Sequence, residues 1–153
     1  MPAAQRGKLM LMRVVFDTSV IVAAARSRRG ASFALVSEIP SKRFEICLSV
    51  PLYMEWQDVL TRPEHLPAGQ RADDALGFLR YLCGQAWLQE IYFHWRPFLP
   101  DLADDMILEL AFAARCTFIV THNVRHFVGC ERLGIKVVAP GQLMRLLNTG
   151  MKS

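Results

Sequence analysis

Hydrophobic residues along the chain fall into short apolar runs separated by longer segments with helical spacing. Runs rich in β-branched and aromatic residues predict strands, at 13–16, 43–49, 88–95, 117–121 and 135–140. Apolar residues three and four positions apart predict helices, at 20–26, 30–40, 50–62, 72–86, 101–116 and 141–147. Most strand runs are continuously apolar, which is typical of a parallel sheet covered on both faces. The pattern therefore predicts an α/β domain with a mainly parallel central sheet.

The chain is expected to form one domain over residues 12–147. We expect residues 1–11 to be a disordered extension and residues 148–153 to be a short tail. With 52% hydrophobic and 21% charged residues, the composition is that of a globular protein and excludes disorder of the whole chain. No apolar run reaches the roughly 18 residues of a membrane span, so no membrane association is expected.

Net charge and cysteine content bear on the possible partners of the protein and on its cellular compartment. The net charge of +4 permits a polyanionic partner such as RNA without requiring one. The four cysteines are scattered, none in a C-x-x-C pair, and the N-terminus has too short an apolar stretch for a secretory signal. These features predict reduced thiols and a cytoplasmic location.

Acidic and amide side chains follow the expected strand ends. Parallel sheets bind ligands beyond the carboxyl ends of their strands, and the polar residues expected at that edge are Asp17, Glu55, Asp101, Asp104, Asp105 and Asn123. Oxygen ligands of this kind suit Mg²⁺ or Mn²⁺, and a divalent cation would relieve the repulsion between them. Asp105 shares a helix face with Asp101 and Glu109, so we expect Asp105, followed by Asp104, to point inward.

Each of these residues also has a purely structural interpretation. Asp17 could cap the helix that follows it, and the acids at the start of helix 101–116 could simply complement its dipole. A zinc site is a further alternative, with His122, His126, Cys116 and Cys130 as ligands. It is disfavoured because NVRHFVG, residues 123–129, is predicted to be a loop or a single turn.

Four motifs occur in order along the chain: VVFDTSV, SVPLYMEWQDVL, DLADDMILELAFAA and FIVTHNVRHF. Each is short, but their order and spacing resemble the PIN-domain family over about residues 12–147. The resemblance is greatest to bacterial VapC toxins of toxin–antitoxin pairs.

This resemblance implies a three-layer α/β/α domain that acts as a Mg²⁺- or Mn²⁺-dependent endoribonuclease. It implies catalytic roles for Asp17, Glu55 and Asp105. Further metal ligands would be Asp104 and Asn123, and the expected substrate contacts are Thr18, Ser19, Thr121, His122 and Arg125. The implied partners are RNA, an antitoxin that covers the acidic pocket, and a second copy of the chain in a homodimer.

The motif after strand 117–121 departs from the family pattern. Many PIN domains have T-x-D there, whereas this chain has T-H-N, with Asn123 in place of the aspartate. The amide carries no charge, so a second metal position should be weaker; hydrolysis with a single metal stays compatible with the motif, and the number of metals is left open. His126 stands three residues further on, where an acid would otherwise help.

Two other function classes compete with the nuclease. Asn123 could mark a catalytically weakened PIN-like module that binds RNA or protein. The FDTSV motif also resembles phosphatases with an aspartyl nucleophile, but these need a second aspartate where Ser19 stands. The chain has no G-x-x-x-x-G-K-[ST] loop, so nucleotide hydrolysis has no support.

Overall fold

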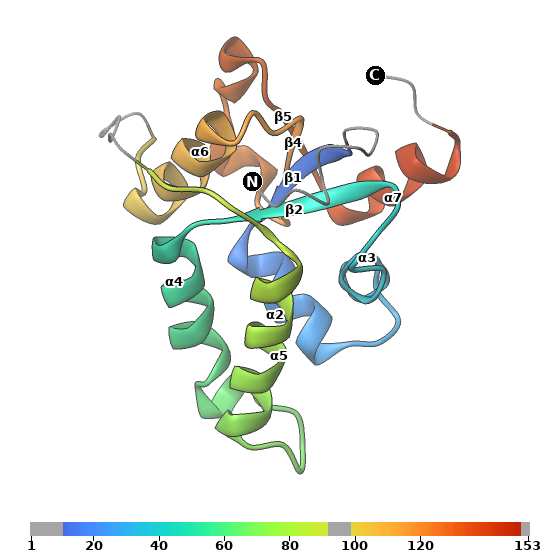
Figure 1. Cartoon of the computed structure of the whole chain (residues 1–153), viewed down its shortest axis with the longest axis vertical. Coiled ribbons are helices and arrows are strands. Elements are labelled where there is room, and N and C mark those ends of the chain that lie inside the picture. The colour runs from blue at the N-terminus through green and yellow to red at the C-terminus, as the bar shows by residue number, and fades with distance from the viewer. Residues whose placement is uncertain (1–10, 92–98, 151–153) are drawn as a thin grey trace.

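The computed structural model describes residues 11–91 and 99–150. Within these residues, five parallel strands form a sheet in the order β3-β2-β1-β4-β5 (Figure 1). The strands are β1 (Met12–Phe16), β2 (Phe44–Leu48), β3 (Trp87–Leu88), β4 (Phe118–Val120) and β5 (Lys136–Val138). The predicted parallel sheet is confirmed. Its central strand is β1, which is followed directly by Asp17.

Helices cover both faces of this sheet. They are α2 (Thr18–Arg26), α3 (Ala31–Ser37), α4 (Val50–Leu60), α5 (Ala72–Gln85), α6 (Leu102–Ala113) and α7 (Pro140–Asn148). Figure 1 shows α6 on one side of the sheet and α2, α4 and α5 on the other, with α3 packed beside α2 and α7. The α/β/α layering is therefore confirmed. None of the described helices is both long and apolar enough to cross a membrane.

The boundaries differ from the predictions in two places. Helix α2 begins at Thr18, two residues before the predicted start, so both hydroxyl residues after Asp17 lie in its first turn. The strand predicted at 88–95 is shorter in its described part, because β3 covers only Trp87–Leu88. Its partner β2 ends at Leu48, which pairs with Leu88, so no neighbouring strand remains to extend the pairing. Residues 92–95 of that prediction lie outside the described residues.

Parts of the predicted terminal segments also lie outside the described residues. These are residues 1–10 of the expected extension and residues 151–153 of the expected tail. At the C-terminal boundary, α7 continues through Asn148, one residue beyond the expected end of the domain.

The core explains why β1 is apolar at successive positions. Val14, Val15 and Phe16 are all fully buried, because β1 has a strand on each side and helices on both faces. The charged residue at the start of β1 is Arg13, whose guanidinium lies 3.7 Å from the centroid of the Trp87 ring. Arg13 Nη1 also donates a hydrogen bond of 3.1 Å to the Ala114 carbonyl. Arg13 therefore connects the start of β1 to β3 and to the end of α6.

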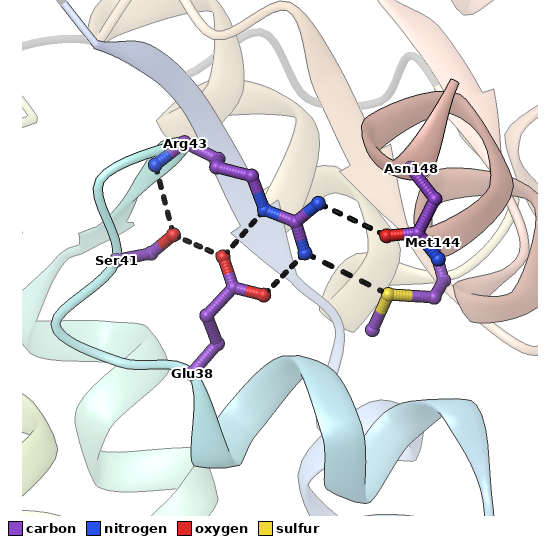
Figure 2. Close-up of polar contacts among 5 residues, drawn as sticks. All are labelled: Glu38, Ser41, Arg43, Met144 and Asn148. Carbon is purple, nitrogen blue, oxygen red and sulfur yellow. Dashed lines mark hydrogen bonds and ion pairs between the residues drawn. The ribbon is translucent and has the colours of Figure 1, made fainter. Parts of the chain in front are cut away.

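A polar network ties the amino-terminal edge of the sheet together (Figure 2). Arg43, just before β2, binds both carboxylate oxygens of Glu38 and donates 3.0 Å to Asn148 Oδ1 at the end of α7. Ser41 donates a further hydrogen bond to Glu38. The hydrogen bond from Arg43 lowers the pKa of Glu38, so the carboxylate stays charged. This network joins α3, β2 and α7 at the edge opposite Asp17.

Candidate active site

Asp17 lies at the carboxyl edge of the central strand. Its backbone N–H donates to Val120 O at 2.9 Å, which holds it between the ends of β1 and β4. Asp17 occupies the N-cap position of α2, yet its carboxylate makes no capping hydrogen bond. The residue is only 7% exposed. A helix cap therefore does not account for this buried carboxylate.

Two hydroxyl groups orient the Asp17 carboxylate. Thr121 Oγ1 donates to Asp17 Oδ2 at 2.6 Å, and Ser19 Oγ donates to the same oxygen at 2.8 Å. Among the described contacts, Oδ1 accepts no hydrogen bond. Asp17 is thus held in a fixed orientation with one oxygen available to a ligand.

Glu55 reaches the same edge from α4. Thr18 Oγ1, in the first turn of α2, donates a short hydrogen bond to Glu55 Oε2. Helices α2 and α4 follow neighbouring parallel strands and pack against each other. Thr18 therefore links the two acids predicted from separate motifs. Three of the predicted substrate contacts, Thr18, Ser19 and Thr121, are hydroxyl residues. Each of these hydroxyls donates a hydrogen bond to a carboxylate of the site.

The three aspartates at the start of α6 make different contacts. Asp101 caps the helix, since its Oδ1 accepts a hydrogen bond from Ala103 N at 2.8 Å. Asp105 is 1% exposed, and its Oδ1 accepts from Leu99 N at 2.7 Å. Asp104 is also buried, but it interacts with the acids of the other elements.

The pKa of Asp104 responds to the charges of the other acids at this edge. Burial raises the pKa of Asp104 to about 6, and the negative charges of Asp101, Asp17 and Glu55 add to the increase. The neighbouring His126 acts in the opposite direction and lowers the pKa. Asp17 and Glu55 accept hydrogen bonds from the adjacent residues Ser19 and Thr18, and their charges act on Asp104, so we call these three acids, from the end of β1, α4 and α6, the acidic cluster.

The segment after β4 adds polar groups beside this acidic cluster. Asn123 N donates to Thr121 Oγ1 at 2.9 Å, and His122 N donates to Ser19 Oγ at 3.1 Å. The His122 ring contacts Ser32 Oγ through Nε2 at 2.8 Å. Arg125 is exposed and makes no side-chain hydrogen bond or ion pair within the described residues. The structure thus brings the backbone of His122 and Asn123 to the site, with the His122 ring directed to Ser32, and leaves the Arg125 side chain exposed.

His126, which the sequence analysis noted three residues after Asn123 but did not assign to the metal ligands or substrate contacts, lies beside the acidic cluster. It lies in a short 3₁₀ turn, Val124–Phe127, and its Nδ1 is 3.4 Å from Asp104 Oδ2. The backbone N–H of His126 donates a hydrogen bond of 2.9 Å to the carbonyl oxygen of Asn123. The spacing of three residues noted in the sequence explains this position, since one 3₁₀ turn brings such residues to the same side.

The raised pKa of Asp104 predicts a pH-dependent stability of the metal-free protein. Between about pH 4 and pH 6 the folded state binds a proton at Asp104 that the unfolded chain does not, so stability from this group increases as the pH falls. At pH 7, Asp104→Asn should raise the free energy of unfolding by about 1–2 kcal/mol, because it removes a buried charge.

Urea unfolding of both proteins in EDTA, from about pH 4 to pH 7, checks this expectation. The difference between variant and wild type should shrink towards acid pH as Asp104 becomes neutral in the folded protein. A difference that stays constant over this range would contradict the electrostatic account.

The donor set fits a divalent cation by its chemistry. Together with burial, the charges of Asp17 and Glu55 from two other elements raise the pKa of Asp104, and hard cations prefer such oxygen ligands. Within the described residues, however, no three His, Cys, Asp or Glu side chains already stand at the spacing of a metal site. The zinc site considered from His122, His126, Cys116 and Cys130 is accordingly not assembled. Asp17, Glu55 and Asp104 are the residues that would hold a cation.

A separate hollow lies away from the acidic cluster. It has a volume of about 720 Å³ and is bordered by α2, α3, α5 and the turn at Pro63–His65. Its walls are largely apolar, and none of the candidate site residues lines it. The acidic edge of the sheet is therefore a different surface from this hollow.

Known proteins share this fold. A chain in VapBC2 of Rickettsia felis, bound to a DNA fragment from its promoter, matches with a TM-score of 0.59 and 14% identity, covering 84% of this chain and 98% of that chain. VapBC-1 of nontypeable Haemophilus influenzae matches with a TM-score of 0.56 and 16% identity, covering 85% and 99%. DNA-bound VapBC of Salmonella typhimurium matches with a TM-score of 0.58 and 16% identity, covering 86% and 99%. At these identities the likeness concerns the fold.

Sequence comparison identifies the family. No curated protein matches the chain. The PIN domain family model matches residues 13–125, which span β1 to the turn after β4 and contain all the candidate site residues except His126. The chain therefore belongs to the PIN-domain family.

Proposed function

We propose that the protein is a Mg²⁺- or Mn²⁺-dependent endoribonuclease that hydrolyses RNA phosphodiester bonds. The observation that carries this proposal is that Asp17 and Glu55, at the carboxyl edge of the sheet, accept hydrogen bonds from the adjacent hydroxyls of Ser19 and Thr18, while the buried Asp104 interacts electrostatically with both acids. Membership of the PIN-domain family supports it. When bound, a divalent cation would supply charge stabilisation at the phosphoryl group and activate water.

We assign the residues of this site by their contacts. Asp17 and Asp104 would hold the cation, Asp17 with its Oδ1 and a carboxylate fixed by Ser19 and Thr121. Glu55, positioned by Thr18, would complete the set. The sequence favoured Asp105 over Asp104; our proposal reverses the two, because Asp105 Oδ1 is engaged by Leu99 N. Asp105 then positions the start of α6.

The RNA would lie over the exposed rim of this site. His122 and Asn123 stand beside the acids, and Arg125 projects from the same turn as a cation for the phosphate backbone. The positive net charge of +4 favours approach of a polyanion despite the local cluster of acids.

We further propose that the protein is the toxin of a toxin–antitoxin pair and acts in the cytoplasm. Three solved structures with the same fold are VapBC complexes, which supports an antitoxin partner for this chain. The antitoxin would cover the acidic cluster and so block access of RNA. The homodimer implied by the sequence resemblance remains a prediction.

Cleavage of a panel of labelled RNAs by the purified protein tests the nuclease proposal. We expect cutting in Mg²⁺ and in Mn²⁺ and none in EDTA, with activity restored when the metal is returned. Asp17→Asn serves as the control for a contaminating nuclease, and it should be inactive under every condition.

A second candidate function rests on Asn123, whose neutral amide stands where many relatives have an aspartate. Equal behaviour of wild type and Asp17→Asn in all three conditions would contradict hydrolysis of these RNAs. It would favour a catalytically weakened module that binds RNA or protein.

A further inference from the structure

We propose that an arginine turn between α2 and α3, residues 26–30 with the sequence RSRRG, binds the phosphate backbone of RNA beside the candidate active site (Figure 1). This inference deepens the proposed function and rests on it, because it concerns how the RNA of that site is held. Recognition would be by charge, without reading the base sequence.

The positive charge of the arginine turn is concentrated and unpaired. Arg26, Arg28 and Arg29 are all exposed, and none of their guanidinium groups makes a hydrogen bond or ion pair with a described residue. Arginines elsewhere pair with an acidic side chain, as do Arg13, Arg43 and Arg62. Three cations within four residues can therefore contact an external anion.

The stability of α2 accounts for only one of these cations. Arg26 lies in the last turn of α2, where a positive charge complements the helix dipole. Arg28 and Arg29 follow the C-cap residue Ser27 and lie outside the helix. The turn has its own hydrogen bond of 3.3 Å, from the Arg29 backbone N–H to Ser27 Oγ, and this bond needs no arginine side chain. The local structure therefore gives no reason for cations at positions 28 and 29.

A buried contact places the start of α3 beside the candidate site. Ser32, the second residue of α3, is 3% exposed, and its Oγ lies 2.8 Å from His122 Nε2. The backbone N–H of His122 donates to Ser19 Oγ, which donates to Asp17. Ser32 comes three residues after Arg29, so their Cα atoms are at most about 11 Å apart. The arginine turn therefore lies next to the segment that borders the acidic cluster.

The arginine turn continues a basic surface that begins at Arg125. Arg125 is exposed and stands three residues after His122, in the short helix Val124–Phe127. Exposed cations are thus found on two segments that meet at His122. The acidic cluster repels phosphate groups, so an RNA strand can be held there only if cations nearby attract its backbone.

The salt dependence of RNA binding measures the number of phosphate contacts. We would titrate a fluorescent single-stranded RNA with the full-length protein in EDTA, which prevents metal-dependent cutting, and follow fluorescence anisotropy. Each phosphate contact of a single strand contributes about 0.7 to the slope of log K against log salt. The triple variant Arg26→Gln, Arg28→Gln, Arg29→Gln should therefore lose about 2 from the slope and bind about tenfold more weakly at low salt.

Two further triple variants serve as controls. Arg132, Lys136 and Arg145 are also exposed, and Lys136 begins β5 at the edge opposite the acidic cluster. Their change to glutamine removes the same charge and should alter RNA affinity by less than about twofold. Lysine at positions 26, 28 and 29 keeps the charge and should keep most of the slope, and circular dichroism should show all variants folded.

The outcomes separate this inference from the proposed function. Equal losses in the two glutamine variants, an unchanged slope in the arginine-turn variant, or no RNA binding by the wild type would each overturn the role of the arginine turn. In cleavage with Mg²⁺, the arginine-turn variant should raise KM about tenfold and change kcat by less than about twofold. Cutting with an unchanged KM overturns this inference and leaves the nuclease intact. RNA binding that depends on the arginine turn, without cutting by the wild type, upholds the surface and overturns the nuclease.

Discussion

Asp104→Asn is expected to lower the rate of RNA cleavage by about 100-fold or more, whereas Asp105→Asn should lose less than about tenfold. Asparagine at 104 keeps the size of the side chain but removes the charge that interacts with Asp17 and Glu55. Asparagine at 105 keeps an oxygen that can accept the hydrogen bond from Leu99 N. Single-turnover cleavage of one labelled RNA at saturating Mn²⁺ measures both rates.

The two variants are matched controls for each other, since they are adjacent and carry the same substitution. Circular dichroism and the urea midpoint should confirm that both remain folded. If Asp105→Asn is the inactive variant and Asp104→Asn retains its rate, the ligand assignment returns to the order that the helix spacing predicted. A loss shared equally by both would mean that the two carboxylates act together.

Phe127→Ala is expected to reduce the free energy of unfolding by about 3–5 kcal/mol, the usual cost of removing a buried aromatic ring. Phe127 is 1% exposed and ends the turn that carries Asn123 and His126. Its loss leaves a cavity under that turn, so the variant should also bind Mn²⁺ more weakly. Urea unfolding followed by circular dichroism measures the change in stability.

Val128→Ala provides the matched control for this prediction. Val128 is the next residue and is 75% exposed, so its truncation should change stability by no more than about 0.5 kcal/mol. A loss below about 1 kcal/mol in Phe127→Ala would show that the turn does not depend on its core contact.

The local pattern of apolar residues was sufficient to predict most of the helices and strands of the fold. The run Val14–Phe16 is apolar at every position, and only a central strand buried on both faces requires that. The length of β3 was not predictable in the same way. It depends on where β2 ends, at Leu48, and a strand's own residues carry no information about the end of its neighbour.

The sequence predicted which edge of the sheet carries the candidate site better than it predicted which side chains form it. Asp17 and Glu55 follow directly from the ends of parallel strands, and the structure joins them through Thr18. The choice between Asp104 and Asp105 depends on how α6 is rotated against the sheet, which spacing within one helix cannot fix. His126 depends on a 3₁₀ turn whose geometry is set by Phe127 in the core.

The hydrogen bond between Thr121 and Asp17 joins residues 104 positions apart in the chain. Because synthesis proceeds from the N-terminus, Asp17 emerges from the ribosome long before its partner. A nascent chain that has not yet extended past β4 lacks both the orienting hydroxyl of Thr121 and the turn that carries His126. The carboxylate of Asp17 therefore gains this orienting contact only after β4 and the residue that follows it have been synthesised, so a truncated chain that ends before Thr121 should carry all three acids of the cluster without the hydroxyl that orients Asp17.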